Sequence, residues 1–344
     1  MNTLAIWVDK QLQKDEIFNA QSAFNRDNCL SKYRLLKSYL ELDGWQVHTQ
    51  DYFEKSNVPN AVLFLEVPDR KVEVLLSRWN HRTERIRTHV ILSECEVVEP
   101  RNWKYKLHDQ FDSIFTWKNS LVDNKRYFHI NFVSSKIDII NVENNNKNKL
   151  CTLISGNKTS AHSLELYSKR VEVIRWFEKN NPVDFDLFGT GWERYVSTSS
   201  RWIRVLFRIK WINKLFYRPY SSYLGKVNSK FETMAKYKYA ICFENAVSIP
   251  DYITEKIFDC FASGCVPIYL GAPNICDKIP SGCFIDARKF PDYEALHQHL
   301  VEITSNEYDN YIENIRNYMR SSAFHAYTKE YFAKSIKERV VNGT

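Results

Sequence analysis

The stretch from Tyr237 to Asn274 reads YKYAICFENAVSIPDYITEKIFDCFASGCVPIYLGAPN. An apolar run at its start is followed by a polar loop, a segment with apolar residues at helical spacing, and a second apolar run, VPIYLG. Continuous apolar strands that alternate with helices are typical of a parallel sheet that helices cover on both faces. The stretch therefore predicts a strand, a helix and a second strand of an α/β fold.

The alternation of strands and helices continues toward the N-terminus. LCTLIS and DFDLFG read as strands, with a helix over 163–180 between them. Still earlier, a helical pattern at 31–42 lies among five strand-like runs, which are TLAIWV, WQVHTQ, AVLFLEV, THVILSE and SIFTW. We therefore predict two Rossmann-like parallel-sheet domains that face a cleft, with ligands at the carboxyl ends of the strands.

A polar patch, NVENNNKNK at 141–149, separates the two series of strands. Such a patch cannot form a core element, so it marks the expected domain boundary. The length of 344 residues also suits two domains. We predict a first α/β domain over 1–148, a second over 149–320, and a C-terminal helix in 321–344 that packs across both domains.

The composition is that of a folded, soluble protein. Hydrophobic residues make up 44% and charged residues 26% of the chain, which excludes wholesale disorder. No apolar run approaches the roughly 18 residues of a membrane span, and the eight cysteines include no CxxC pair. We therefore expect reduced thiols and a cytoplasmic location. The net charge of +7 suits an anionic ligand, a nucleic acid or a membrane surface and selects none of them.

The helix predicted within the opening stretch carries the most chemistry on its polar face. We expect this helix over 252–263, with Asp251 as its N-cap. Tyr252, Glu255 and Lys256 then share one face through the spacing i, i+3 and i+4. The positive end of the helix dipole and the free N–H groups suit a phosphate. The alternative is an ordinary amphipathic helix whose polar face meets water.

A series of motifs around this helix resembles a known family. FEN is followed by DYITEKIFDCFASGCVPIYLGAPN (251–274) and then by FIDARKF (284–290). This order closely resembles the α1,3/4-fucosyltransferases, glycosyltransferase family ten, and a weaker match covers 154–192. The resemblance implies a GT-B architecture, in which 1–148 is the acceptor-side domain that carries the general base and 149–320 binds GDP-fucose.

The resemblance also implies a set of donor-binding residues, drawn from the FEN motif, the Y-x-T-E-K motif and the helix that starts in YSKRVEVI. They are Arg170, Glu244, Asn245, Tyr252, Thr254, Glu255 and Lys256. Arg170 and Lys256 are implied to meet the pyrophosphate, and for Arg170 a solvated helix charge is the alternative. Ala246 stands where the family usually has Ser or Thr, so a hydroxyl contact there is dispensable or replaced.

A carboxylate of the first domain is the expected general base. The apolar run HVILS brings Glu94 to the carboxyl end of a predicted strand, where parallel sheets place reactive groups. Family members carry an acidic residue in this loop, and the spacing of the following V-V-x-P is retained, so Glu94 matches best. Directly after it, Cys–Glu replaces the family's Ser/Pro–Pro pair, which leaves Glu96 and Glu99 as alternative bases.

The implied reaction is the inverting transfer of fucose from GDP-fucose to a hydroxyl of an acceptor glycan, with an α1,3 linkage to N-acetylglucosamine or glucose favoured. A carboxylate accepts the hydroxyl proton, and positive groups hold the departing GDP. We expect no cofactor and no essential metal, because Asp184 and Asp186 begin an apolar strand and offer too few oxygen ligands. The alternatives are another nucleotide-sugar donor on the same fold, and a basic nucleic-acid- or glycan-binding protein without turnover.

The segment RWIRVLFRIKWINKLFYR at 201–218 carries six basic residues and no acid. As a helix it would be basic and amphipathic, of the kind that lies on membrane surfaces. Peripheral membrane contact through 201–218 is therefore one interpretation, and an insertion packed on the donor domain is the other. The sequence contains no RNP, KH, zinc-finger or basic-region motif, so we expect no nucleic-acid partner.

Overall fold

The computed structural model describes residues 2–79, 85–134, 136, 147–196, 209 and 217–342. The chain divides into two compact units. They are Met1–Ser135 together with Ser322–Thr344, and Lys136–Ser321. The division falls at 135/136, whereas the sequence predicted 148/149, and the C-terminal residues return to the first unit.

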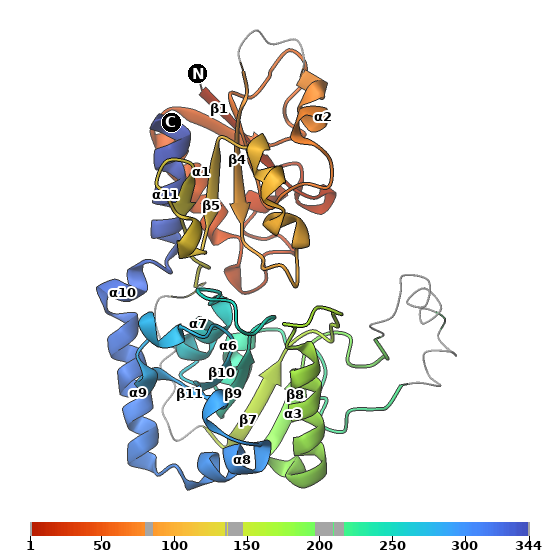
Figure 1. Cartoon of the computed structure of the whole chain (residues 1–344), viewed down its shortest axis with the longest axis vertical. Coiled ribbons are helices and arrows are strands. Elements are labelled where there is room, and N and C mark those ends of the chain that lie inside the picture. The colour runs from red at the N-terminus through yellow and green to blue at the C-terminus, as the bar shows by residue number, and fades with distance from the viewer. Residues whose placement is uncertain are drawn as a thin grey trace. The chain divides into compact units, whose positions relative to one another are not determined.

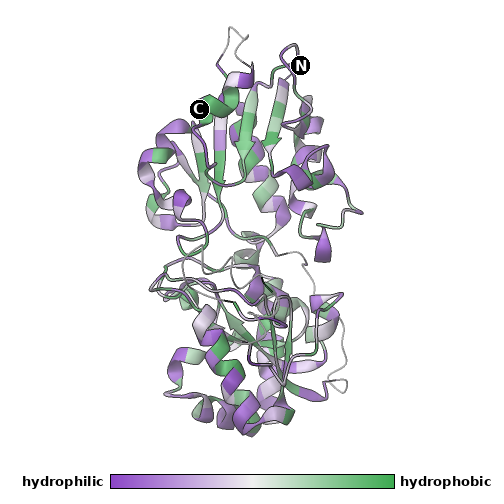
Figure 2. Ribbon diagram, turned by 90° about the vertical axis from the view of Figure 1, so that its right-hand side faces the viewer, coloured by the Kyte–Doolittle hydropathy of each residue, from purple (hydrophilic) through white to green (hydrophobic). Residues whose placement is uncertain are grey.

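The first unit is built on a parallel sheet. Among the described residues, six strands pair in the order β2-β1-β3-β4-β5-β6, and every pair is parallel. The strands are β1 (Asn2–Trp7), β2 (Trp45–Thr49), β3 (Ala61–Phe64), β4 (Arg87–Leu92), β5 (Ser113–Thr116) and β6 (Tyr127–His129). Figure 2 shows these strands largely in the hydrophobic colours, as expected where both faces of a sheet are covered. All five predicted runs are strands, and β6 adds an edge strand.

The C-terminal helix packs on the first helix of the chain. The helices of the first unit are α1 (Ser31–Leu42), α2 (Val72–Leu76), α10 (Ser322–His325) and α11 (Lys329–Asn342). Figure 1 shows α11 beside α1. Leu36 and Leu40 of α1 join Phe332 and Ile336 of α11 in one buried cluster. This apolar contact explains why the C-terminal segment belongs to the first unit, whereas the sequence predicted packing across both domains.

The second unit is built on another parallel sheet. Its five strands, counted over the described residues, pair in the order β11-β10-β9-β7-β8. The strands are β7 (Lys149–Ile154), β8 (Phe185–Phe188), β9 (Tyr237–Phe243), β10 (Val266–Leu270) and β11 (Ile285–Asp286). The predicted α/β fold with two Rossmann-like parallel sheets is therefore confirmed.

Helices alternate with these strands along the chain. They are α3 (Tyr167–Asn180), α6 (Lys230–Met234), α7 (Glu255–Ala262), α8 (Tyr293–Glu302) and α9 (Ser305–Met319). Thr304 and Glu307 form a capping box that begins α9, with the Glu307 carboxylate accepting the Thr304 N–H at 2.9 Å. The C-terminal helix predicted in 321–344 is instead two helices, α10 and α11, both in the first unit, whereas α9 before them belongs to the second unit.

Two sequence-based expectations concern membranes. In the part of the chain that the structure describes, no helix is both long enough and apolar enough to span a bilayer. The basic segment 201–218, with its predicted amphipathic helix, lies outside the described residues except for positions 209, 217 and 218.

Candidate active-site residues

Acidic side chains follow directly after strands of both sheets. Glu244 comes immediately after β9 in the second unit, and Glu66 and Glu94 each come two residues after a strand of the first unit, β3 and β4. The carboxyl edge of a parallel sheet is where its ligands bind. Each unit therefore carries carboxylates at the edge where chemistry is expected.

Glu244 is a fully buried carboxylate that binds the start of α7. Its side chain accepts the Thr254 N–H at 2.8 Å and the Thr254 hydroxyl at 2.7 Å, and it pairs with the Lys256 ammonium at 3.1 Å. Gly271 leaves the space for this side chain, because a Cβ there would lie 2.5 Å from the Glu244 Cγ. A buried carboxylate needs such partners to offset its lost hydration.

The start of α7 differs from the prediction. Thr254 is the N-cap, and its hydroxyl accepts the Lys256 N–H at 3.5 Å. Asp251, the predicted N-cap, has a left-handed backbone with φ of 65° and exchanges hydrogen bonds with the Asn274 side chain. Tyr252 consequently lies in the preceding loop, and the predicted shared helix face with Glu255 and Lys256 is wrong. The contacts of Glu244 with Thr254 account for the later start of the helix.

The side chain of Lys256, which these contacts hold in place, is partly exposed to solvent. Its exposed fraction is 28%, while its ammonium also donates to the Thr254 hydroxyl at 2.8 Å. Glu255, half-buried, stands beside it in the first turn of α7. The partial positive charge of the helix N-terminus adds to that of the ammonium. An anionic group at this edge would therefore meet a cation held in place by a buried carboxylate.

Arg170, Asn245 and Tyr252 form a buried layer next to the loop after β9. The Arg170 guanidinium, 4% exposed, donates to the carbonyls of Phe243 and Glu244 at 2.6 and 2.7 Å and to the Asn245 side chain at 3.1 Å. The Asn245 amide in turn donates to the Tyr252 hydroxyl at 3.3 Å. Arg170 is thus not a solvated helix charge. It joins α3 to the end of β9, and burial lowers its pKa.

Glu94 lies on a loop whose backbone is bound on both sides. The N–H groups of Ser93 and Glu94 donate to the Glu66 carboxylate at 3.1 and 3.2 Å. The Glu94 carbonyl accepts from the Asn102 amide at 3.1 Å and from the Trp103 indole at 3.0 Å. The half-buried Glu94 side chain therefore projects from a backbone with little freedom to move.

Glu66 is a residue that the sequence did not single out. Burial, together with a smaller effect of the neighbouring Glu94 carboxylate, raises its pKa to about 8. Its backbone has a φ of 119°, which is unusual for a residue with a side chain. The available signal was an acid directly after a run of apolar residues, AVLFL.

The two alternative bases have different surroundings. Glu99 forms a bidentate pair with the Arg101 guanidinium, with both contacts at 2.7 Å, and this contact lowers the pKa of Glu99. Glu99 is therefore occupied by a local structural contact. Glu96 is half-buried, and one of its carboxylate oxygens is buried without a hydrogen-bond partner in the described chain. Glu96 thus remains available for chemistry beside Glu94.

The aspartates of the DFD sequence have separate partners. Asp184 binds the His297 ring at 2.8 Å, and Asp186 accepts from the Tyr237 hydroxyl at 2.5 Å. Among the described residues, no three His, Cys, Asp or Glu side chains are grouped so that they could hold a metal ion. Both aspartates therefore serve contacts within the second unit.

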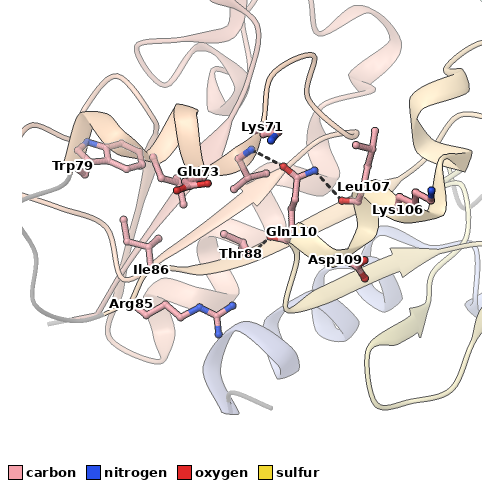
Figure 3. Close-up of a pocket in the computed structure, with 12 residues that line it drawn as sticks. Lys71, Glu73, Trp79, Arg85, Ile86, Thr88, Lys106, Leu107, Asp109 and Gln110 are labelled. Atoms are coloured by element: carbon pink, nitrogen blue, oxygen red, sulfur yellow. Dashed lines mark hydrogen bonds between the residues drawn. The ribbon is translucent and has the colours of Figure 1, made fainter.

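Each unit also contains a pocket. One of about 670 Å³ lies near the amino end of β4, where Gln110 accepts the Val72 N–H at 2.8 Å (Figure 3). This pocket is remote from Glu94, which follows the other end of the same strand.

The pocket in the second unit has a volume of about 310 Å³. It is lined by residues that follow β7 and β8, including Asn157 and Arg194, and by Arg175 of α3. It therefore lies at the carboxyl edge of the second sheet.

Comparisons with known proteins point to one family. Residues 143–337, more than half of the chain, match the family described as glycosyltransferase family 10 (fucosyltransferase), C-terminal part. An Arabidopsis thaliana alpha-(1,4)-fucosyltransferase is 41% identical over 70 residues, which is 20% of this chain and 17% of that protein. The Gallus gallus GDP-fucose protein O-fucosyltransferase 3 is 34% identical over 86 residues, 24% of this chain and 18% of that protein. The matches thus span less than a fifth of these relatives.

A similarity in fold extends over the whole chain. The crystal structure of an alpha1,3-fucosyltransferase with GDP has a TM-score of 0.58 and 14% sequence identity. The alignment covers 100% of this chain and 92% of that one. At this identity the similarity concerns the fold, which is that of the GT-B fucosyltransferases.

Proposed function

The chain belongs to glycosyltransferase family 10, and from this we propose that it transfers fucose from GDP-fucose to a hydroxyl group of an acceptor glycan. The observation that carries the proposal is the first turn of α7. There the Lys256 ammonium is partly exposed and is held 3.1 Å from the buried Glu244 carboxylate, inside the matched residues 143–337.

Lys256 and the N-terminus of α7 bind the diphosphate of the donor in this proposal. Their positive charges stabilise the negative charge that develops on GDP as it departs. Arg170 and Asn245 support the loop after β9 through their mutual hydrogen bond at 3.1 Å. The fucose lies against the half-buried Glu255, whose carboxylate can accept from sugar hydroxyls. Tyr252 is fully buried and supports this site through its hydrogen bond with Asn245.

Glu94 acts as the general base. Its carboxylate takes the proton of the acceptor hydroxyl, whose oxygen forms a bond to the anomeric carbon. The bond from that carbon to the phosphate oxygen breaks, and GDP leaves with the electron pair. Attack opposite to the leaving group inverts the configuration. Glu96, with its unpartnered carboxylate oxygen, is the second candidate for this role.

The acceptor is a glycan hydroxyl, with an α1,3 linkage to N-acetylglucosamine or glucose as our first choice. One relative is named for an α1,4 linkage and another for protein O-fucosylation, so the acceptor panel should contain both classes. We also propose that the transfer needs no metal, since Lys256 and the helix N-terminus supply positive charge. Activity retained in EDTA would support this, and loss that Mg²⁺ or Mn²⁺ restores would contradict it.

The test is a GDP-release assay on the full chain. GDP-fucose is offered with free oligosaccharides and with folded protein acceptors, and GDP-mannose and UDP-glucose serve as donor controls. Of the three donors, we expect only GDP-fucose to give a product. NMR then determines the linkage and the anomeric configuration of that product. Turnover that requires another nucleotide sugar would overturn the proposed function. The absence of turnover with every pair of donor and acceptor would also overturn it.

A further inference from the structure

We propose that Glu66 is a positioning residue for the general base, and that it acts by binding the backbone from which Glu94 projects. This inference rests on the proposed function, because it assigns Glu66 a part in the same reaction. Glu66 belongs to a different strand connection from Glu94, and the two residues are 28 positions apart. Their contact exists only because β3 and β4 are neighbours in the sheet.

The first observation is the convergence of hydrogen bonds on one carboxylate. One Glu66 oxygen accepts the Ser93 N–H at 3.1 Å, and the other accepts the Glu94 N–H at 3.2 Å. These amides follow the last residue of β4, so neither continues the ladder of that strand. A single side chain thus binds the two peptide groups that lead into the proposed base.

The second observation is the backbone of Glu66 itself. A φ of 119° is costly for any residue with a Cβ, and such a conformation persists only where the surroundings impose it. Strained residues of this kind gather at functional sites. The strained backbone directs the Glu66 side chain toward the end of β4, where a hydrogen-bonded carboxylate is needed.

The third observation is that Asn102 completes the arrangement. Its side-chain amide donates to the Glu66 carboxylate and, at 3.1 Å, to the Glu94 carbonyl. Its side-chain oxygen accepts the Val67 N–H at 3.0 Å, and its carbonyl is bound by the His108 ring at 2.7 Å. Glu66 therefore binds the backbone N–H of Glu94 and Asn102 binds its carbonyl, and Asn102 also binds the residue next to Glu66.

The consequence for catalysis concerns distance. A general base must lie within hydrogen-bond reach of the proton it takes, and a displacement of about 1 Å can cost as much as 100-fold in rate. Rotation of the Glu94 peptide would move its carboxylate by at least this much. Glu66 itself touches neither donor nor acceptor in this proposal, so its loss should affect turnover and leave donor binding intact.

The test compares two carboxylates that bind opposite ends of β4. In Glu66→Gln, one side-chain oxygen can still accept a hydrogen bond. The new NH2 group faces a backbone N–H group and cannot accept from it. Asp112→Asn is the matched control, because Asp112 accepts the Thr88 N–H at 2.8 Å near the amino end of the same strand. For Glu66→Gln we expect kcat to fall by about 10- to 100-fold, with the KM for GDP-fucose within about twofold of wild type. Asp112→Asn should keep kcat within about twofold.

Two further measurements separate positioning from general stability. Amide hydrogen exchange at Ser93 and Glu94 should become faster in Glu66→Gln and stay unchanged in Asp112→Asn. In a Glu94→Gln background, Glu66→Gln should lower kcat no further, because residues that act as a unit are not additive. Glu66→Asp, which keeps the carboxyl group and shortens the side chain, should show the same pattern and serves if the Gln variant does not fold.

The outcomes are distinguishable. A wild-type chain without fucosyl transfer to any acceptor would overturn the proposed function, and this inference with it. An active wild type in which Glu66→Gln or Glu66→Asp has normal kcat would overturn the inference alone. A full additional loss in the Glu94→Gln background, or an equal loss in Asp112→Asn, would reduce Glu66 to a structural residue.

Discussion

The loop after β9 and the loop after β3 both contain a carboxylate that binds a neighbouring backbone, but the two carboxylates have different partners. Glu244 is fully buried and meets the Lys256 ammonium at 3.1 Å. Glu66 is partly buried and, within the described chain, forms no ion pair; it accepts only neutral N–H donors, and burial raises its pKa to about 8. The comparison teaches that a buried carboxylate with a cation serves as a counter-charge, and one without a cation serves as a hydrogen-bonding brace.

The largest expected effect is on the reaction itself. Glu94→Gln should lower turnover by about 100-fold or more, because the amide cannot accept the acceptor's proton. Calorimetry should give an unchanged affinity for GDP-fucose. The control is Glu96→Gln, which should retain most of its turnover. Near-native turnover in Glu94→Gln together with loss in Glu96→Gln would transfer the role of base to Glu96.

The next effect concerns stability and tests the comparison directly. Glu244→Gln removes the counter-charge of Lys256, and we expect the free energy of unfolding to fall by about 2 kcal/mol, less than for a fully buried pair because Lys256 is partly exposed. Glu66→Gln replaces a largely neutral acid at pH 7, so about 1 kcal/mol is expected. Urea unfolding at pH 7 measures both. A larger loss in Glu66→Gln than in Glu244→Gln would contradict the distinction.

A moderate effect is expected on donor affinity. Lys256→Ala should weaken GDP binding about tenfold, the scale of one charge-assisted contact to a phosphate. Isothermal calorimetry with GDP measures this, and Lys289→Ala, an exposed lysine of the same unit, is the control. Equal affinities in wild type and Lys256→Ala would remove Lys256 from the diphosphate site.

The last expected effect is a dependence of stability on pH. The pKa of Glu66 is about 8 in the folded chain, against an ordinary value of 4.5. Between these values the folded state holds a proton that the unfolded state has lost, so stability falls as the pH rises from 4.5 to 8. The slope is at most about 1.4 kcal/mol per pH unit.

The difference between wild type and Glu66→Gln isolates this contribution. Asp259, whose pKa burial raises to about 7, gives a similar dependence in both proteins and cancels. Urea unfolding across this pH range should therefore show a steeper decline in wild type than in Glu66→Gln. Parallel curves would mean that Glu66 is ionised like an exposed carboxylate.

Much of the fold could be predicted from local patterns. The helix expected at 31–42 is α1 with the same bounds, and the apolar runs of both units are strands. The C-terminal segment was harder, because its apolar stripe could pack on either unit. Its partner, α1, lies almost 300 residues away, and no local pattern indicates such a contact.

The candidate site could be predicted in its residues and less well in its geometry. Tyr252, Glu255 and Lys256 were singled out from one motif, yet Tyr252 is not part of the helix that carries the other two. For Arg170, predicted to meet the pyrophosphate, the structure excludes the alternative of a solvated helix charge, because its side chain is buried against the end of β9. In both cases the decisive hydrogen-bond partners lie at the end of β9, outside the helix concerned.

The amino-acid sequence by itself determined the α/β alternation, the two parallel sheets and the family, because apolar periodicity and a contiguous motif are local properties of the chain. Only the tertiary structure decided where α7 begins, which acid binds the Glu94 backbone, and which unit receives α11. Each of these depends on strands or helices brought together by sheet order and packing, as when Glu66 meets the amides at the end of β4. Contacts of that kind have no period in the sequence, so they appear only when the chain is folded.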